Sequence, residues 1–384
     1  MAGVADLLRR ADEAVAQGDL EAASALLAEA AEQSTTPEIW LRLAGLRRAA
    51  RQPRQALAYV YRALETAPLD FTALTMRASL LSALDDPQAG EAWGNAIAQR
   101  PPGDLPPALA AALNRGEQEH EAWRTAREDR MRLAMATAEQ EADADARVRI
   151  ARFRDNVLRK TRPYHCEPTH FHFPGLIERE FHPRSSFPWL AGLEAATPEI
   201  TAELQAVMDA ERNALVPYIQ YAAHEPLDQW QPLNHNLDWT AIHLLQNGRT
   251  IDVNARHCPQ TLALIAGYDQ PSIAGASPNA MFSLLAPNTQ IPAHVGVSNA
   301  RLVCHLPLIV PPGCWFRVGS ETREWRVGEA FVFDDTIEHE AMNPTDELRV
   351  VLIFDLWHPG LGAAERAAVR ALIESEGEGP AGGL

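Results

Sequence analysis

Two histidines in the C-terminal third of the chain, followed by one arginine, have the types and spacing of a metal-dependent site. His294 and His339 each lie in a stretch rich in Val, Ile, Phe and Leu, and Arg349 follows ten residues after His339. The 44 residues between the histidines allow several short strands to fold back and bring the two imidazoles together. Neutral imidazole binds Fe(II) well, and two histidines leave open positions for an oxidant and a chelating co-substrate. Arg349 would then bind the remote carboxylate of that co-substrate through a charge-assisted pair.

Further motifs surround the histidine pair, and together they form a specific pattern. They are Asp238-Trp239-Thr240, Ser283 eleven residues before His294, the run from His294 through Gly296 to Arg301-Leu302, Phe333-Asp334-Asp335 before His339-Glu340, and Asp355-Leu356-Trp357-His358-Pro359. With these motifs, residues 163–359 resemble the aspartyl/asparaginyl β-hydroxylase family of 2-oxoglutarate-dependent oxygenases. Helical repeats before the catalytic domain also occur in that family.

The resemblance implies a role for each of these residues. His294 and His339 would bind Fe(II), and Arg349 with Ser283 would bind the distal carboxylate of 2-oxoglutarate. His305 would help to hold the carboxylate next to the keto group, and Trp239 would line the co-substrate pocket. The expected activity is hydroxylation, with O2, at the β-carbon of an Asp or Asn residue in a peptide or protein.

Two positions modify this expectation. Most oxygenases of the superfamily carry Asp or Glu two residues after the first histidine, but this chain and the family that it resembles have glycine, here Gly296. Radical halogenases also have a small residue there to admit chloride, although the surrounding motifs favour hydroxylation. The family usually has a second arginine after Arg301-Leu302 where this chain has Val303, which leaves the substrate open and makes Arg301 a further candidate for contact with the co-substrate.

Several residues also have simpler interpretations. Trp239, Ser283 and His305 are residue types that commonly serve a strand or a core, and Asp334 and Asp335 suit either the orientation of an imidazole or a turn. Other candidate features are the His165, Cys166, His170 and His172 cluster, which suggests zinc but has no second half, and the segment 314–329, which is typical of a structural hairpin. Cys258 stands alone where secreted members of the family have a cysteine pair, so no disulfide is expected there.

The elements around these motifs predict a multidomain α + β chain. Small residues recur with a period of 33, as in Ala30, Ala63 and Ala96, and this spacing resembles tetratricopeptide repeats over residues 1–105. Residues 106–162 are charged and helical, which is typical of a connector. Short apolar runs bounded by Pro, Gly, Asn and Asp then predict a double-stranded β-helix, a cupin-like jelly roll, within 163–384, with its core at about 235–360.

Composition limits the possible partners and the compartment. The 384 residues carry a formal net charge of −17, which argues against nucleic acid because phosphate binding needs a basic surface. No apolar run approaches the length of a membrane helix, and the start of the chain lacks the layout of a signal peptide, so we expect a cytoplasmic protein. The repeats would hold the peptide or protein substrate. The alternatives are a non-enzymatic adaptor with a degenerate oxygenase domain, and an oxygenase or halogenase of small molecules.

Overall fold

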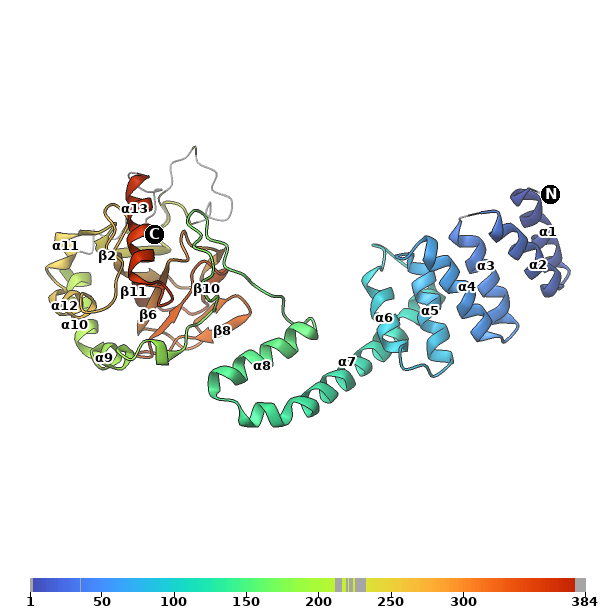
Figure 1. Ribbon diagram of the computed structural model, residues 1–384, viewed down its shortest axis with the longest axis horizontal. Coiled ribbons are helices and arrows are strands. Elements are labelled where there is room, and N and C mark those ends of the chain that lie inside the picture. Colours follow the sequence, from blue (N-terminus) through green and yellow to red (C-terminus); the bar gives the residue numbers. More distant parts are fainter. Residues whose placement is uncertain are drawn as a thin grey trace. The chain divides into compact units, whose positions relative to one another are not determined.

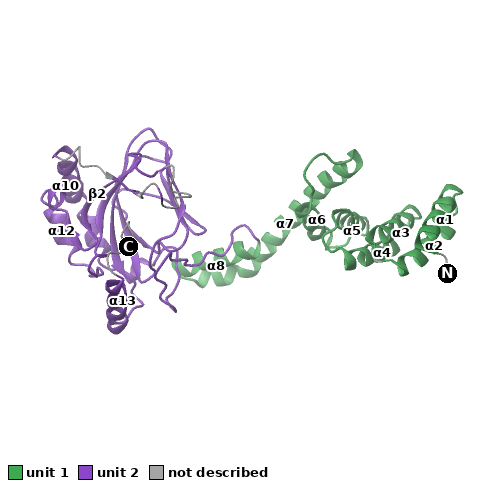
Figure 2. Ribbon diagram, turned by 90° about the horizontal axis from the view of Figure 1, so that it is seen from above, with its two compact units in different colours: residues 1–158 green, residues 159–384 purple. Residues whose placement is uncertain are grey.

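The computed structural model describes residues 3–34, 36–210, 216–218, 220, 224 and 233–376. The chain divides into two compact units, residues 1–158 and residues 159–384, which Figure 2 shows in green and purple. The predicted connector falls almost entirely within the first unit. No helix in the described parts combines the length and the apolar character needed to cross a membrane.

The first unit consists of helices that pack in sequence order. They are α1 (Val4–Ala16), α2 (Leu20–Glu32), α3 (Pro37–Ala49), α4 (Pro53–Thr66), α5 (Phe71–Ala83), α6 (Ala89–Ala98), α7 (Pro107–Glu141) and α8 (Ala144–Val157). The periodic alanines Ala30, Ala63 and Ala96 are completely buried, because small side chains let paired helices approach closely. The predicted helical repeats are therefore confirmed.

The start of α7 packs on the repeats instead of standing apart from them. A side chain at Gly116 would clash with the Trp93 ring, and one at Gly94 would clash with His120. Within the charged, helical connector that the sequence predicts over 106–162, the structure has two helices, and Asp143 begins the second by accepting a hydrogen bond from the Ala146 amide. The first part of the predicted connector is thus part of the repeat core.

The second unit contains two antiparallel sheets, as predicted for a double-stranded β-helix (Figure 1). In the larger sheet the order is β1 (Val216–Pro217), β2 (Trp239–Gln246), β4 (Ala280–Leu285), β11 (Arg349–Trp357), β6 (Arg301–Ile309) and β9 (Phe331–Phe333), with β3 (Arg249–Thr250) beside β2. In the smaller sheet the order is β5 (Thr289–His294), β10 (His339–Asn343), β7 (Trp315–Val318) and β8 (Glu321–Glu324). The second strand of the predicted hairpin therefore ends at Glu324 and does not extend to Glu329.

Helices cover the face of the larger sheet that points away from the smaller sheet (Figure 1). The sequence predicts one helix over 198–208, which appears as α10 (Thr197–Ala210). The prediction missed η1 (Arg184–Ser186), α9 (Leu190–Ala195), α11 (Asp252–Ala255), α12 (Pro259–Ile265) and α13 (Ala363–Ser375). Most of these are too short for a helical period to be visible in the sequence.

Strand register brings the two candidate histidines together. β10 pairs with β5 so that His339 lies directly opposite His294. An aromatic and aliphatic core fills the space between the sheets and includes Trp239, Phe316, Trp325 and Phe333. The inner faces of both sheets therefore point toward the histidine pair.

Candidate functional site

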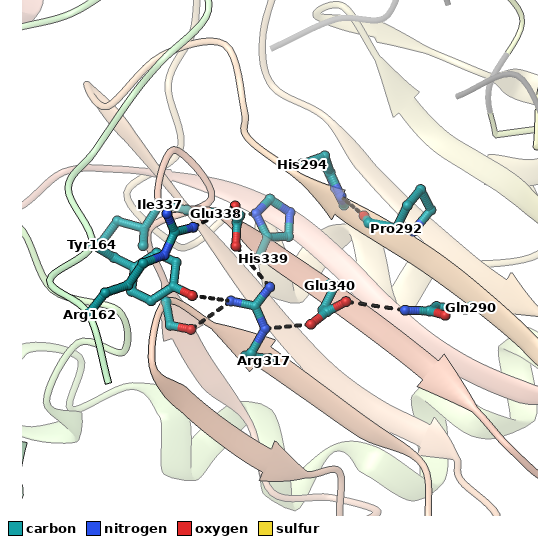
Figure 3. Close-up of polar contacts among 11 residues, drawn as sticks. Arg162, Tyr164, Gln290, Pro292, His294, Arg317, Ile337, Glu338, His339 and Glu340 are labelled. Atoms are coloured by element: carbon teal, nitrogen blue, oxygen red, sulfur yellow. Dashed lines mark hydrogen bonds and ion pairs between the residues drawn. The ribbon is translucent and has the colours of Figure 1, made fainter. Parts of the chain in front are cut away.

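The imidazoles of His294 and His339 are in contact, with ring centroids 3.9 Å apart. Nδ1 of His294 donates to the Pro292 carbonyl at 2.7 Å, and Nδ1 of His339 donates to the Ile337 carbonyl at 3.1 Å (Figure 3). Because a carbonyl oxygen only accepts, each Nδ1 carries the proton and the lone pair lies on Nε2. Burial lowers the pKa of His339 to about 4 and, together with the His339 charge, lowers the pKa of His294 well below its ordinary value. Both rings are therefore neutral near pH 7, the state in which imidazole binds metal.

Gly296 has no room for any side chain. A Cβ atom there would lie 2.3 Å from Oδ2 of Asp335. The Asp335 carboxylate therefore fills the space that the carboxylate of an Asp or Glu at position 296 would need. Asp335 is held there by Arg301, whose Nη2 donates to Oδ2 at 2.8 Å. Asp334 instead accepts from the amide and hydroxyl of Thr336 and so stabilises the turn before His339. The two aspartates thus have different roles.

Arg349 begins β11 and is almost completely buried, with 1% of its surface exposed. Its Nη1 makes only long contacts to Ser283, 3.3 Å to the carbonyl oxygen and 3.4 Å to Oγ, while Trp239 donates to the same Oγ at 3.1 Å. β2, β4 and β11 are neighbours in the larger sheet, which brings these three side chains together. In the described parts of the chain, Arg349 has no acidic partner, and burial lowers its pKa to about 9.

A line of aromatic side chains connects Arg349 to the histidine pair. The Arg349 guanidinium lies over Trp325, 4.7 Å from the ring centroid, and Trp325 stacks near His305. His305 in turn packs against Phe316 and Phe333, and both of these rings also contact His339. Trp325 is not among the site residues predicted from the sequence, where its signal is an aromatic residue between two charged ones, Glu324 and Arg326.

Three buried polar atoms along this line have no hydrogen-bond partner among the described residues. They are Nε of Arg349, Nδ1 of His305 and Nε1 of Trp325. Buried polar groups are nearly always paired, so a cluster of unpaired ones indicates a polar ligand. A short keto acid with two carboxylates fits these groups, and the two Nε2 lone pairs fit a divalent metal.

Arg301 differs from Arg349 because its charge is compensated by Asp335. Val303, where the family usually has arginine, is buried in the core between the sheets and lies opposite Phe333 in the register. Among the described residues no group of three or more His, Cys, Asp or Glu side chains forms a metal site. The His165 and Cys166 side chains instead contact Glu178.

The fold and the site define a cupin-like double-stranded β-helix with a two-histidine centre. Residues 194–359 match the family model described as aspartyl/asparaginyl beta-hydroxylase, so the predicted resemblance is confirmed. The chain is 31% identical over 216 residues to aspartate beta-hydroxylase domain-containing protein 2 of Xenopus tropicalis, a match that covers 55% of this chain and 56% of that protein. It is 28% identical over 206 residues to aspartyl/asparaginyl beta-hydroxylase of Homo sapiens, covering 52% and 27%.

The matches therefore span about half the length of the first relative and about a quarter of the second. Among solved structures, the Sgt2 TPR domain from Aspergillus fumigatus aligns with 37% of this chain and 85% of that chain, at 17% identity and a TM-score of 0.27.

Proposed function

We propose that the second unit is an Fe(II)- and 2-oxoglutarate-dependent hydroxylase. The observation that carries the proposal is the buried guanidinium of Arg349, which has no acidic partner in the part of the chain that the structure describes. It is connected through Trp325 and His305 to two neutral imidazoles that are in contact. A buried charge without a partner is costly, and a carboxylate of the co-substrate would offset that cost. The match to the hydroxylase family supports the same activity.

The chain's own groups would orient the reactants. His294 and His339 would hold Fe(II) through Nε2, and their Nδ1 hydrogen bonds would keep both rings in the tautomer that binds metal. When bound, the iron supplies O2 activation coupled to oxidation of 2-oxoglutarate to succinate and CO2. Arg349, with Ser283, would hold the distal carboxylate of 2-oxoglutarate, and His305 would lie beside the carboxylate next to the keto group. The aromatic side chains between the sheets would exclude water.

The position of Asp335 argues against halogenation. A chloride near Gly296 would meet the Asp335 carboxylate, which already fills the space beside the glycine. Hydroxylation is thus the better assignment, and the intact pair of histidines disfavours a purely non-enzymatic adaptor.

The activity can be tested with purified protein, Fe(II), ascorbate and 2-oxoglutarate. We expect succinate to form, and peptides that contain Asp or Asn to gain the mass of one oxygen atom. Succinate formation by wild type that persists unchanged after removal of iron with a chelator would contradict the proposal.

We further propose that the substrate is a peptide or protein and that the repeats hold it. A stack of helix pairs forms an extended surface that suits a polypeptide better than a metabolite. A chain starting at Arg159, the first residue of the second unit, should form succinate in the absence of substrate but lose most of its efficiency toward a peptide or protein. Equal efficiency of the truncated and full chains would instead favour a small-molecule substrate.

A further inference from the structure

The strand that carries His339 is held from its outer side by one arginine. Arg317 lies on the neighbouring strand β7 and contacts both glutamates that flank the histidine (Figure 3). Its Nε donates to Glu340 Oε1 at 2.5 Å, and its Nη2 donates to Glu338 Oε1 at 3.0 Å. A third hydrogen bond, from Nη1 to the Gly319 carbonyl at 2.7 Å, fixes the guanidinium itself. We call Arg317, Glu338 and Glu340 the arginine clamp.

Strand alternation explains how this clamp acts on the histidine. Successive side chains of a strand point to opposite faces, so His339 points between the sheets while Glu338 and Glu340 point away. On β7, Val318 pairs with His339 and is buried, whereas Arg317 pairs with Glu340. One guanidinium therefore spans the residues before and after His339 and restrains the backbone on both sides of the imidazole.

The clamp also connects to other segments near the site. Gln290 lies on β5, the strand that carries His294, and its Nε2 donates to Glu340 Oε2 at 3.2 Å. Arg162, near the start of the second unit, donates to Glu338 Oε2 at 3.1 Å, and the Tyr164 hydroxyl lies 3.4 Å from Arg317 Nη1 (Figure 3). The Arg317 side chain is only 16% exposed, so these contacts are better shielded than an ordinary surface pair.

We infer that Arg317 is a positioning residue that holds the His339 imidazole in the place required for metal binding with His294. The inference rests on the proposed metal site. The His339 ring itself is held by the hydrogen bond of Nδ1 to Ile337 and by packing against Phe316 and Phe333. The clamp adds restraint to the strand from which the ring projects, and it does so without touching the metal.

The direction in which metal affinity changes when Arg317 is replaced distinguishes a positioning role from a purely electrostatic one. Arg317 carries a positive charge near a site that would bind a cation, so loss of that charge alone would strengthen metal binding. Loss of the clamp would weaken metal binding, because the imidazole would no longer be held in place. The two explanations therefore predict changes in opposite directions.

The experiment is a titration of the full chain with Co(II), in which visible absorption measures coordination of the metal. We expect Arg317→Gln to weaken Co(II) binding about tenfold, within the range for residues that support metal ligands. Arg317→Lys, which keeps the charge and one of the contacts, should fall between Arg317→Gln and wild type. The control is Arg326→Gln, which makes the same change in an exposed pair with Glu329 and should bind as wild type does. Unchanged or tighter binding by Arg317→Gln would overturn the inference.

A second measurement does not depend on metal. Amide hydrogen exchange of metal-free protein should be faster across β10 in Arg317→Gln and unchanged in Arg326→Gln, and equal exchange across β10 would contradict the clamp. If Arg317→Gln does not fold, Glu340→Gln, which weakens the contacts of Glu340 with Arg317 Nε and with Gln290, should likewise speed amide exchange across β10. Failure of wild type to bind metal would overturn the proposed function and the role in metal binding together. Normal binding by both wild type and Arg317→Gln would overturn the clamp alone.

Discussion

At the level of single residues, two buried arginines differ in how their charges are compensated. Arg301 forms an ion pair with Asp335, whereas the partners of Arg349 among the described residues are Ser283, at long distance, and the Trp325 ring. Both begin strands of the larger sheet, and both are buried. The difference indicates that Arg301 serves the protein's own structure and that Arg349 is available for a ligand anion.

We therefore expect Arg349→Ala to raise the Michaelis constant for 2-oxoglutarate by well over tenfold. Truncation of one partner of a buried charge pair costs about 2–5 kcal/mol, and each 1.4 kcal/mol is about tenfold in affinity. Steady-state kinetics with 2-oxoglutarate measure this directly, with Arg326→Ala as the exposed control. A Michaelis constant like that of wild type would mean that another cation binds the carboxylate.

Gly296 provides a second test at this scale. Gly296→Ala would place a methyl group 2.3 Å from Asp335 Oδ2, so the carboxylate must move away from Arg301 and the histidines must adjust. We expect at least a tenfold loss of succinate formation, and a larger loss for Gly296→Asp, which adds a second carboxylate. The matched control is Gly192→Ala, where an added Cβ meets nothing within 4 Å. Equal activity of Gly296→Ala and wild type would show that Asp335 moves freely.

At the level of elements, an irregular segment supports the backbone beside both histidines. The Glu167 amide donates to the Thr336 carbonyl at 2.8 Å, and the Thr169 amide donates to the Gly296 carbonyl at 3.0 Å. Asn299, buried after β5, fixes the end of this segment by accepting from the Phe173 amide and donating to the Phe173 carbonyl. The segment 162–173 thus acts as a strap over the site.

Asn299→Ala should release this strap. Removing the side chain leaves the Phe173 amide and carbonyl without partners, at a cost of about 1–3 kcal/mol. We expect faster amide exchange in residues 165–175 and lower metal affinity, with the first unit unchanged. Exchange equal to that of wild type in this segment would show that the backbone contacts alone hold it.

These elements also show what the sequence predicts and what it does not. The strands over 280–285 and 301–309 are visible because apolar residues run without interruption between turn signals. The strap has no such pattern, because its backbone amides donate to residues more than 120 positions away. Arg317 alternates with Phe316 and Val318 and so has the pattern of a solvent-facing residue, and only the register of β7 against β10 reveals its partners.

At the level of the whole molecule, buried histidines should make the second unit sensitive to acid. Burial, then the charges of His358 and Arg179, lower the pKa of His182 to about 3 from an ordinary value of 6.5. In the unfolded chain, His182 therefore binds a proton below about pH 6.5. In the folded chain it binds that proton only below about pH 3. The contribution of neutral His182 to the free energy of unfolding is fully present above pH 6.5. It is lost as the pH falls toward 3, at about 1.4 kcal/mol per pH unit.

His182→Phe keeps a ring at this position and removes the titrating group. The melting temperature of the variant, relative to that of wild type, should therefore rise as the pH is lowered from 7 to 4.5. Thermal unfolding of the metal-free proteins at several pH values provides the measurement. A constant difference between the two proteins across this range would show that His182 is not linked to folding.

The central claim is that His294 and His339 together form one metal site. Anaerobic titration with Fe(II), with bound metal measured after removal of the excess, tests this claim most directly. We predict one Fe(II) per chain for wild type and a loss of at least a hundredfold in affinity for either His294→Ala or His339→Ala, with binding kept in the exposed variant His165→Ala. Wild-type affinity in either His294→Ala or His339→Ala would contradict the account.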